Sequence, residues 1–143
     1  MRMKGLCAIL VFVLSFVCFT GPVFASKWVY LGKQILYSGE VRVDYLDVDS
    51  VVKNDKAGTM VYWLLSEIKN GDHELKKMTK YETQLDELQR TRYLEWHVYD
   101  RNNNLRLEGN QPQDTWQDVE EATVLDKAVE MASEMVGFGG GLK

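Results

Sequence analysis

Residues 60–68 read MVYWLLSEI and give the strongest β-strand signal in this sequence of 143 residues. Side chains along a β-strand point alternately to its two faces. One face of this segment would carry Val61, Trp63 and Leu65. The other would carry Met60, Tyr62, Leu64 and Ile68. Because both sets are apolar, we predict a central strand that is covered on both faces.

Strand patterns also precede this segment. Residues 27–31 are apolar and aromatic, and Gly32 after them indicates a turn. Residues 34–38 would then extend the strand or form a short hairpin return that ends at Gly39. Residues 41–45 alternate apolar and charged side chains, which is typical of a half-buried strand. The polar run 47–50 is expected to break this strand, and residues 54–58 are expected to form a turn.

Three further strands are predicted after the central one, at residues 76–85, 90–99 and 105–107. Turn-forming residues separate them at 70–72, 86–87 and 100–104. In the strand 90–99, one face is expected to carry Leu94, Trp96 and Val98. The opposite face is expected to carry Tyr93, His97 and Tyr99.

The apolar period changes near the C-terminus. The spacing of five residues places them on one stripe of a helix: Leu125, Ala128, Val129, Ala132 and Val136. Thr123 is a candidate N-cap, with Asp126 three residues later, and Gly137 is a candidate C-cap. Such a helix buries its stripe against a sheet. We therefore predict an α+β fold, with a single antiparallel β-sheet of about five to six strands and a C-terminal α-helix packed on it.

The first 25 residues have the layout of a signal peptide. Two basic residues precede an apolar run over residues 6–19, and small residues follow at the end of the segment. Cleavage is predicted between Ala25 and Ser26. We therefore expect a protein that is exported to the periplasm or the cell surface and has no transmembrane segment in its mature form. An uncleaved membrane anchor is the alternative.

Removal of residues 1–25 would leave a β-rich domain at 26–136 and a flexible glycine-rich tail at 137–143. Both cysteines, Cys7 and Cys18, would be removed with the signal. The mature protein would then have neither a disulfide nor a cysteine nucleophile. Lipid attachment at Cys18 is an alternative, but the preceding Val17 is larger than the small residue that such a site requires.

Charge and motifs exclude several classes of function. The chain has a formal net charge of −4, and loss of the basic signal peptide makes it more negative. An acidic domain is a poor electrostatic match for nucleic acid, so no nucleic-acid partner is expected. The sequence has no nucleophile elbow, phosphate-binding loop or zinc-protease helix. We therefore expect neither an enzyme nor a bound cofactor.

Two acidic groups could be interpreted as metal sites, but a structural role is favoured for both. Residues 100–104 begin like a calcium loop, but Leu105 and Gln111 stand where such a loop needs Gly and Glu. A hairpin turn is the better interpretation. The second group is Asp44, Asp47 and Asp49, where capping of backbone N–H groups at a strand end is favoured. No metal site is predicted, and His97 is expected to be partly exposed between Glu95 and Tyr99.

Aromatic and basic residues give the only candidate binding features. Most of the large aromatic residues are expected in the core, with a few on a sheet face that binds a partner: Trp28, Tyr62, Trp63, Tyr81, Tyr93, Trp96, Tyr99 and Trp116. Five basic residues would form a local patch if their strands pair: Lys76, Lys77, Lys80, Arg90 and Arg92. This patch is our candidate surface for an acidic partner. Protection of strand edges by lysine is the alternative.

Several short motifs occur in a characteristic order. They are WVYLG at 28–32, YLDVDSV at 45–51, MVYW at 60–63, RYL at 92–94 and VYDRN at 98–102, followed by Trp116, Val119 and the predicted helix. In this order the chain resembles the surface-adhesin protein E-like family over about residues 28–135. Members of that family begin with an aromatic strand after the signal and close with a Trp and a short helix.

The resemblance implies a small exported antiparallel sheet domain with a terminal helix. The family's named member is an adhesin for host extracellular-matrix and serum proteins such as laminin, vitronectin and plasminogen, so a protein partner of that class is implied here. Many members carry two cysteines at positions that correspond to about Leu85 and Ala132. Without them, packing alone must hold the helix on the sheet.

These observations lead to one expectation and two alternatives, a carrier and, less favoured, a hydrolytic enzyme. We expect an exported, non-enzymatic bacterial surface or periplasmic binding protein. The first alternative is a periplasmic accessory protein or carrier, with a small apolar ligand between the sheet and the helix. In addition, the edge strands of so small a sheet could pair between two copies and form a homodimer.

Overall fold

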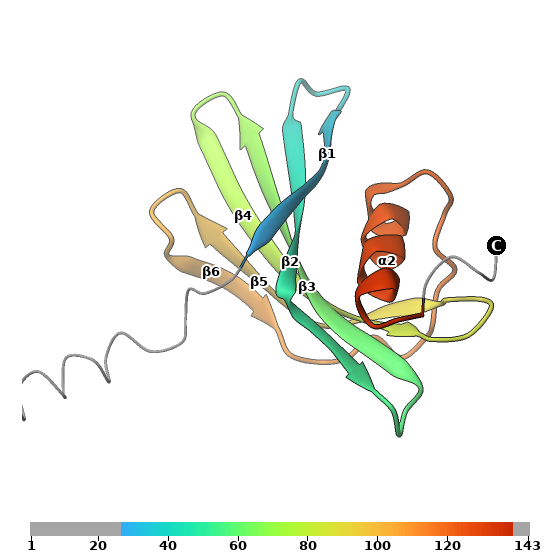
Figure 1. The fold of residues 1–143 in the computed structure, drawn as a ribbon. Helices are drawn as coiled ribbons and strands as arrows, with labels where there is room; N and C mark the ends of the chain where they lie inside the picture. The colour runs from blue at the N-terminus through green and yellow to red at the C-terminus, as the bar shows by residue number, and fades with distance from the viewer. Residues whose placement is uncertain (1–26, 139–143) are drawn as a thin grey trace, which may run out of the picture.

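The computed structural model describes residues 27–138. In this part of the chain, six strands are followed by one helix (Figure 1): β1 (Trp28–Ile35), β2 (Val41–Asn54), β3 (Thr59–Asn70), β4 (His73–Gln84), β5 (Thr91–Asp100), β6 (Leu105–Gly109) and α2 (Val124–Met135). Each strand pairs antiparallel with the next, in the order β1-β2-β3-β4-β5-β6. The predicted α+β fold is therefore confirmed. The predicted cleavage point between Ala25 and Ser26 and tail residues 139–143 lie outside the described residues.

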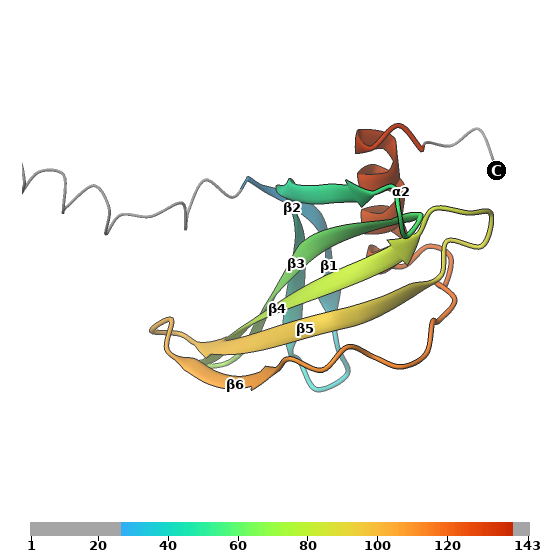
Figure 2. The same cartoon turned by 90° about the horizontal axis from the view of Figure 1, so that it is seen from below.

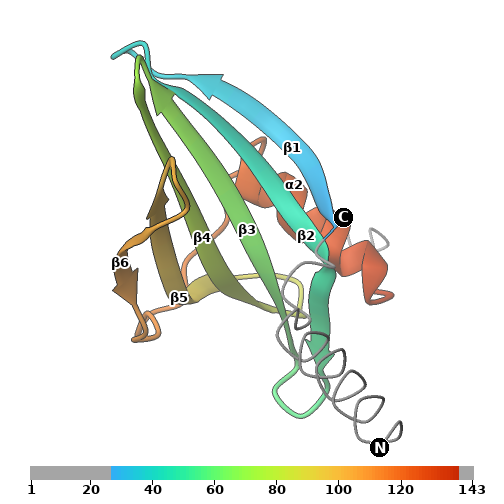
Figure 3. The same cartoon turned by 90° about the vertical axis from the view of Figure 1, so that its left-hand side faces the viewer.

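The two faces of the sheet have different surroundings. The helix α2 packs against β1, β2 and β3 on one face, which we call the helix face. Figure 3 shows the opposite face in front and α2 behind the strands. This opposite face carries Val61, Trp63 and Leu65, and we call it the open face. These three side chains are only partly buried, so the prediction that β3 is covered on both faces is wrong. Its apolar side chains are shielded by their neighbours on adjacent strands instead.

The strand β1 is longer than predicted. It continues through Gly32 to Ile35, and a register shift between Tyr30 and Gly32 absorbs the irregularity. The turn predicted at Gly32 is therefore wrong, and the predicted extension of the strand over residues 34–38 holds only as far as Ile35. The chain turns at residues 37–39, where Gly39 has a φ of 81°. The hairpin then closes through the N–H of Leu36, which donates to the carbonyl of Glu40 at 2.8 Å.

The strand β2 does not end at residues 47–50 but bends there. Asp47 pairs with Trp63, and the next pair is Val52 with Val61, so β2 carries several extra residues against Tyr62 alone. An insertion of this kind bends a strand without ending it. The hydroxyl of Ser50 accepts the N–H of Trp63 at 2.9 Å, which satisfies a donor that the insertion would otherwise leave unpaired. Figure 2 shows that the two parts of β2 run in different directions.

The strand β5 contains a further irregularity, which places Tyr93 and Leu94 on the opposite faces to those predicted. Lys80 pairs with Glu95, but Tyr81 pairs with Tyr93, so Leu94 has no direct partner. Tyr93 therefore lies on the helix face, and Leu94 lies beside Trp63 on the open face. Both assignments differ from strict alternation, because one extra residue reverses the side-chain direction for the rest of a strand.

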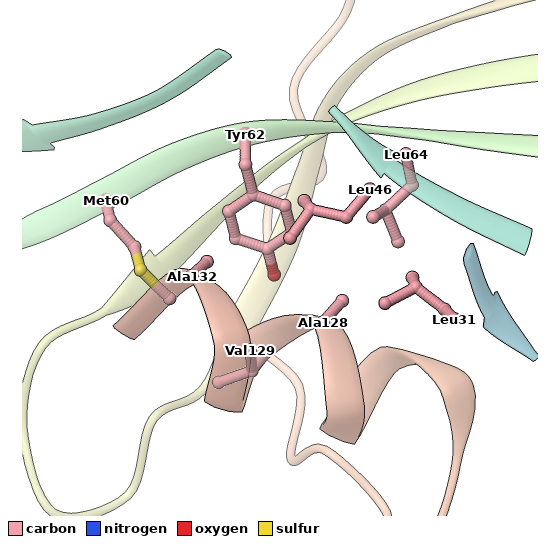
Figure 4. Close-up of a cluster of buried hydrophobic side chains, with 8 residues drawn as sticks. All are labelled: Leu31, Leu46, Met60, Tyr62, Leu64, Ala128, Val129 and Ala132. Carbon is pink, nitrogen blue, oxygen red and sulfur yellow. The ribbon is translucent and has the colours of Figure 1, made fainter. Parts of the chain in front are cut away.

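The core lies between α2 and the first three strands. Figure 4 shows its eight side chains, none of which is more than 6% exposed: Leu31, Leu46, Met60, Tyr62, Leu64, Ala128, Val129 and Ala132. Leu125 and Val136 of the predicted helical stripe pack against this cluster. Burial of one large apolar side chain stabilises a fold by about 1.5–3 kcal/mol, so this cluster holds the helix on the sheet.

Both ends of α2 are capped as predicted. The hydroxyl of Thr123 accepts the N–H of Asp126 at 3.1 Å, and the Asp126 carboxylate accepts the N–H of Ala122 at 3.1 Å. At the C-terminus, Gly137 has a φ of 76°, and its N–H donates to the carbonyl of Glu134 at 3.1 Å. The N–H of Phe138 donates to the carbonyl of Ser133 at 2.8 Å, which completes a Schellman motif.

Polar groups are also buried on the helix face. Asp44 is 1% exposed and accepts hydrogen bonds from Arg42 Nε, at 3.1 Å, and from the Ser66 hydroxyl. Its second carboxylate oxygen has no hydrogen-bond partner among the described residues. The Tyr62 hydroxyl lies 2.8 Å from that of Thr83, and burial raises the pKa of Tyr62 to about 12. Burial also raises the pKa of Tyr81.

The distribution of aromatic residues differs from the expectation that most are in the core. Of the eight large aromatic residues predicted to lie in the core or on a sheet face, only Tyr62 is buried. The other seven are partly exposed, and they lie along strands β1 and β3–β5 and in the segment before α2. Two geometric reasons apply: Trp63 and Tyr99 lie on the open face, away from α2, and α2 makes its main contacts with β1–β3 rather than with β4 and β5.

Candidate binding site on the open face of the sheet

An apolar and aromatic row crosses the open face. Cross-strand pairing places one residue of each strand in this row: Tyr30, Tyr45, Leu65, Met78, His97 and Glu108. The rings of Tyr30 and Tyr45 meet edge-to-face with centroids 6.1 Å apart. His97 lies 5.8 Å from the Trp63 ring and 6.4 Å from the Tyr99 ring. The open face therefore carries partly exposed rings, with charged side chains such as Lys76, Lys80, Glu95 and Glu108 among them.

A groove of about 670 Å³ lies beside this row, under the β2–β3 hairpin. Its lining residues are Ser50, Val52, Lys53, Asn54, Asp55, Lys56, Val61, Trp63, Lys80 and Leu94. Val61, Trp63 and Leu94 supply an apolar floor from β3 and β5. The second part of β2 and the turn after it supply a polar rim.

The bend in β2 builds this groove. Without the extra residues between Asp47 and Val52, β2 would continue flat beside β3 and its end would not form a wall. The same bend turns Val48 and Val51 toward the core, where they pack against the buried cluster. The bend in β2 therefore provides both a contact with the core and a wall of the groove.

Lysines give the groove a mixed electrostatic character. Lys80 Nζ lies 5.9 Å from the centroid of the Trp63 ring and 3.6 Å from the Glu95 carboxylate. Lys56 lies on the turn of the hairpin. Lys53 pairs across the strands with the core residue Met60, so its side chain lies on the helix-face side, where it forms an ion pair with Asp55 at 3.4 Å.

His97 and its two carboxylate neighbours lie further along the open face. His97 Nε2 is 3.2 Å from Glu95, and Nδ1 is 3.4 Å from Glu108. The prediction that His97 is partly exposed between Glu95 and Tyr99 is confirmed. Glu108 was not anticipated, because its position depends on the register of β6 against β5.

The five predicted basic residues do not gather on one surface. Lys76 and Lys80 lie on the open face, where Lys76 donates to the side chain of Asn103 at 3.2 Å. Lys77 lies on the helix face, with Nζ 5.6 Å from the centroid of the Trp96 ring. Strand alternation separates Lys76 from Lys77 in this way.

Arg92 and Arg90 have separate surroundings. Arg92 Nε donates to the Glu82 carboxylate at 3.0 Å, and its guanidinium lies 4.7 Å from the Trp116 ring. Arg90 precedes β5, and its buried Nε has no hydrogen-bond partner among the described residues. Of the candidate set, Lys80 alone lines the groove.

Metal binding finds no support in the described residues. Within residues 27–138, His, Cys, Asp and Glu form no group of three that could hold a metal ion. Asp100 closes the β5–β6 hairpin, where its carboxylate accepts the N–H groups of Asn102 and Asn104 at 2.9 and 3.0 Å. The predicted hairpin turn is therefore confirmed. Asp47 accepts the N–H of Asp49 at 3.1 Å, as the capping interpretation predicts.

A second hollow of about 480 Å³ lies between the β3–β4 and β5–β6 hairpins. Acidic residues, histidine and arginine are intermixed along it, including Asp72, His73, Asp100 and Arg106. Arg106 is already paired with Asp100 at 3.0 Å. This hollow has no aromatic floor, so the groove under the β2–β3 hairpin is the better candidate site.

No family model, curated protein or solved structure matches the chain. Among residues 27–138, the structure has no helix with the length and apolar character needed to cross a membrane.

Proposed function

We propose that this chain is an exported, non-enzymatic binding protein that recognises a protein partner with the open face of its sheet. The observation that carries the proposal is the half-exposed aromatic row beside the groove at Trp63. Trp and Tyr are enriched among residues that dominate binding energy at protein interfaces. Export rests on the signal peptide predicted at residues 1–25.

The partner class rests on the resemblance to the surface-adhesin protein E-like family. That resemblance suggests host extracellular-matrix or serum proteins, such as laminin, vitronectin and plasminogen, as partners. Localisation to the periplasm or the cell surface follows from the same proposal. Protease accessibility on intact cells would distinguish the two locations.

The test is binding of the exported chain to immobilised matrix and serum proteins. Val52 and Leu107 form a matched pair, because they are 61% and 62% exposed but lie on the open face and the helix face respectively. We expect Val52→Asp to weaken binding and Leu107→Asp to leave it unchanged. Background binding by the unmodified chain, or equal losses in both variants, would contradict the proposal.

The filled interior favours a protein partner over the carrier alternative. Eight side chains occupy the space between α2 and the sheet where a small apolar ligand would need a cavity. Native mass spectrometry of the chain purified from its own cell envelope gives a direct check. A protein mass without an additional ligand is expected, whereas a retained small molecule would support the carrier.

The homodimer stays a prediction with two available edges. Within the described sheet, β1 and β6 are the outer strands. Lys127 Nζ donates to the carbonyl of Leu31 at 3.0 Å, which places a charged side chain against the bulge of β1 and disfavours pairing there. Leu105 and Leu107 leave β6 as the better edge. Light scattering that gives a dimer mass would support the pairing, and a monomer mass would exclude it.

A further inference from the structure

The β1–β2 hairpin ends in an apolar tip, Ile35, Leu36 and Tyr37, that the described residues leave uncovered. Ile35 and Leu36 are 73% and 42% exposed, and Tyr37 is fully exposed. Two backbone hydrogen bonds close the tip, from the N–H of Leu36 to the carbonyl of Glu40 at 2.8 Å and from the N–H of Gly39 to the carbonyl of Leu36 at 2.9 Å. Consecutive exposed apolar side chains are unfavourable in water, and such a run is typical of a binding surface.

The groove under the β2–β3 hairpin offers a complementary surface. Val61, Trp63 and Leu94 form its apolar floor, and Val52 lines its wall with a 61% exposed side chain. Polar and charged residues of the hairpin surround these apolar side chains. The groove volume of about 670 Å³ lies within the range of about 300–1,000 Å³ that is typical of ligand pockets, so a few side chains fit in it.

The tip and the groove lie at opposite ends of the sheet. The tip lies at the pair Ile35–Val41, where β2 begins, and the groove lies at the pair Val52–Val61, near the end of β2. Figures 1 and 3 show the β1–β2 and β2–β3 hairpins at opposite ends of the strands. The tip therefore cannot reach the groove of its own chain, and the two surfaces can meet only between copies.

From this arrangement we propose that the apolar tip of one copy docks in the groove of a second copy. Ile35 and Tyr37 of the first copy pack on the floor around Trp63 of the second. One contact then covers both the exposed apolar run and the apolar floor, which is the reason to assign this occupant. The two surfaces differ, so the contact joins copies head to tail into an open chain or, where the rotation closes, a ring. The inference goes beyond the proposed function, because it needs no other partner.

The contact is expected to be weak and to depend on concentration. Stable protein interfaces bury about 1,200–2,000 Å² in total, and a contact through one hairpin tip covers less than this. The tip is already ordered by its own hydrogen bonds, which lowers the entropic cost of docking. We therefore expect monomers in dilute solution and assemblies as the concentration rises.

Sedimentation equilibrium of the exported chain at increasing concentration is the first test, and the mean mass should rise above that of a monomer. Tyr37→Asp on the tip and Val52→Asp on the groove wall should each weaken association about tenfold or more, as loss of one anchor side chain does. Leu88→Asp is the matched control, because Leu88 is 61% exposed in the β4–β5 turn and belongs to neither surface. A monomer mass at every concentration, or equal losses in all three variants, would overturn the proposal.

An equal mixture of the two weakened variants shows whether the tip and the groove contact each other. The Val52→Asp chain keeps an intact tip and the Tyr37→Asp chain keeps an intact groove, so one complete contact can form between them. We expect dimers in the mixture at a concentration where each variant alone is monomeric. A mixture that stays monomeric would contradict the contact. Pairing of β6 edges depends on neither residue, so association that persists in both variants would assign it to that edge and overturn the proposal.

Cysteine cross-linking locates the contact. Residues 26–143 contain no cysteine, so an introduced thiol is unique in the exported chain. An equal mixture of Tyr37→Cys and Val52→Cys chains should form a mixed disulfide under mild oxidation, since a disulfide needs Cα atoms within about 7 Å of each other. The control mixture of Leu88→Cys and Val52→Cys chains should stay at background. Equal yields in the two mixtures would contradict the proposal.

A lipid surface is the other apolar environment that the tip could enter. If the chain stays monomeric but co-sediments with vesicles of phosphatidylethanolamine and phosphatidylglycerol, and Tyr37→Asp abolishes this, the tip binds a membrane and the proposal is wrong. Failure of the inference leaves the proposed function standing, because binding of a dilute chain to matrix or serum proteins is measured separately. Association without any such binding would reject the proposed partner class alone.

Discussion

Adjacent residues of β3 show how differently the two faces of the sheet are built. Tyr62 is fully buried under α2, and its hydroxyl is hydrogen-bonded to that of Thr83. Trp63, the next residue, is partly exposed in the groove beneath Lys80. In a strand that alternates in this way, side chains on one face can stabilise the fold while those on the other face bind a partner. Substitutions on the open face should therefore alter binding at a lower cost in stability than substitutions on the helix face.

The largest effect on stability is expected from a comparison of Leu64 with Leu65, which are neighbours on opposite faces of β3. Leu64 is buried in the core, and Leu65 is partly buried on the open face. Leu64→Ala should lower the free energy of unfolding by about 2–5 kcal/mol, and Leu65→Ala by less than half of that amount. Urea unfolding of the two variants measures the difference. Equal losses would show that an unrecognised layer covers the open face.

The next test compares a buried charge with an exposed one. Arg42→Met leaves the buried Asp44 without its ion-pair partner, which should cost about 1–3 kcal/mol. Lys53→Met breaks the exposed pair with Asp55 and should cost less than about 1 kcal/mol. Adding Asp44→Leu to Arg42→Met should recover part of the loss, because the unpaired carboxylate is then removed. A double variant less stable than Arg42→Met would argue against this account.

A smaller effect is expected at the start of α2. Thr123→Ala removes the cap of the Asp126 N–H and should cost about 1 kcal/mol, or a few degrees in melting temperature. Thr115→Ala, at an exposed position before the helix, is the control. Hydrogen exchange should speed up in α2 while the Trp63 indole signal stays unchanged. Movement of that signal would mean that the groove depends on the docked helix.

The smallest effect on stability is expected at Asp100, in the β5–β6 hairpin. A hydrogen bond from the N–H of Asn104, a second from the N–H of Asn102 and the charge of Arg106 hold the pKa of Asp100 below its ordinary value. The ionised form is thus favoured in the folded state, so the stabilisation is present above the unfolded pKa and is lost as pH falls through the folded pKa. Asp100→Asn should therefore be slightly less stable near neutral pH and equal to the unmodified chain in strong acid. Thermal unfolding from pH 2 to 7 measures this, and a constant difference would exclude the carboxylate as its cause.

Much of the fold could be predicted because the decisive signals are local. The alternation around Tyr62, the turn at residues 70–72 and the stripe that contains Ala128 each depend on nearby residues. The bend at Ser50 could not be predicted, because a polar run is compatible with either a strand end or a bulge. For the same reason the faces of Tyr93 and Leu94 were predicted incorrectly, since one unpaired residue changes the direction of every side chain beyond it.

The candidate site depended on these unpredicted irregularities. The predicted basic set contained Lys80 but not Lys56, because the bend in β2 and the turn after it form the other wall of the groove. Leu94 reached the groove only through the irregularity in β5. Aromatic residues on a sheet face are predicted as a binding feature, but which rings are exposed depends on the strand register and on which strands α2 covers.

The consecutive order of the strands has a consequence for the time course of folding. Each hairpin in β1–β6 joins neighbours in sequence, so its loop closes at low entropic cost. The helix differs, because its contact between Lys127 and Leu31 spans 96 residues. In a chain that is synthesised from its N-terminus, the hairpins can form in succession. The helix face then stays uncovered until the segment that forms α2 has also been synthesised. The apolar side chains around Tyr62 are then the surface that a chaperone would have to shield during that interval.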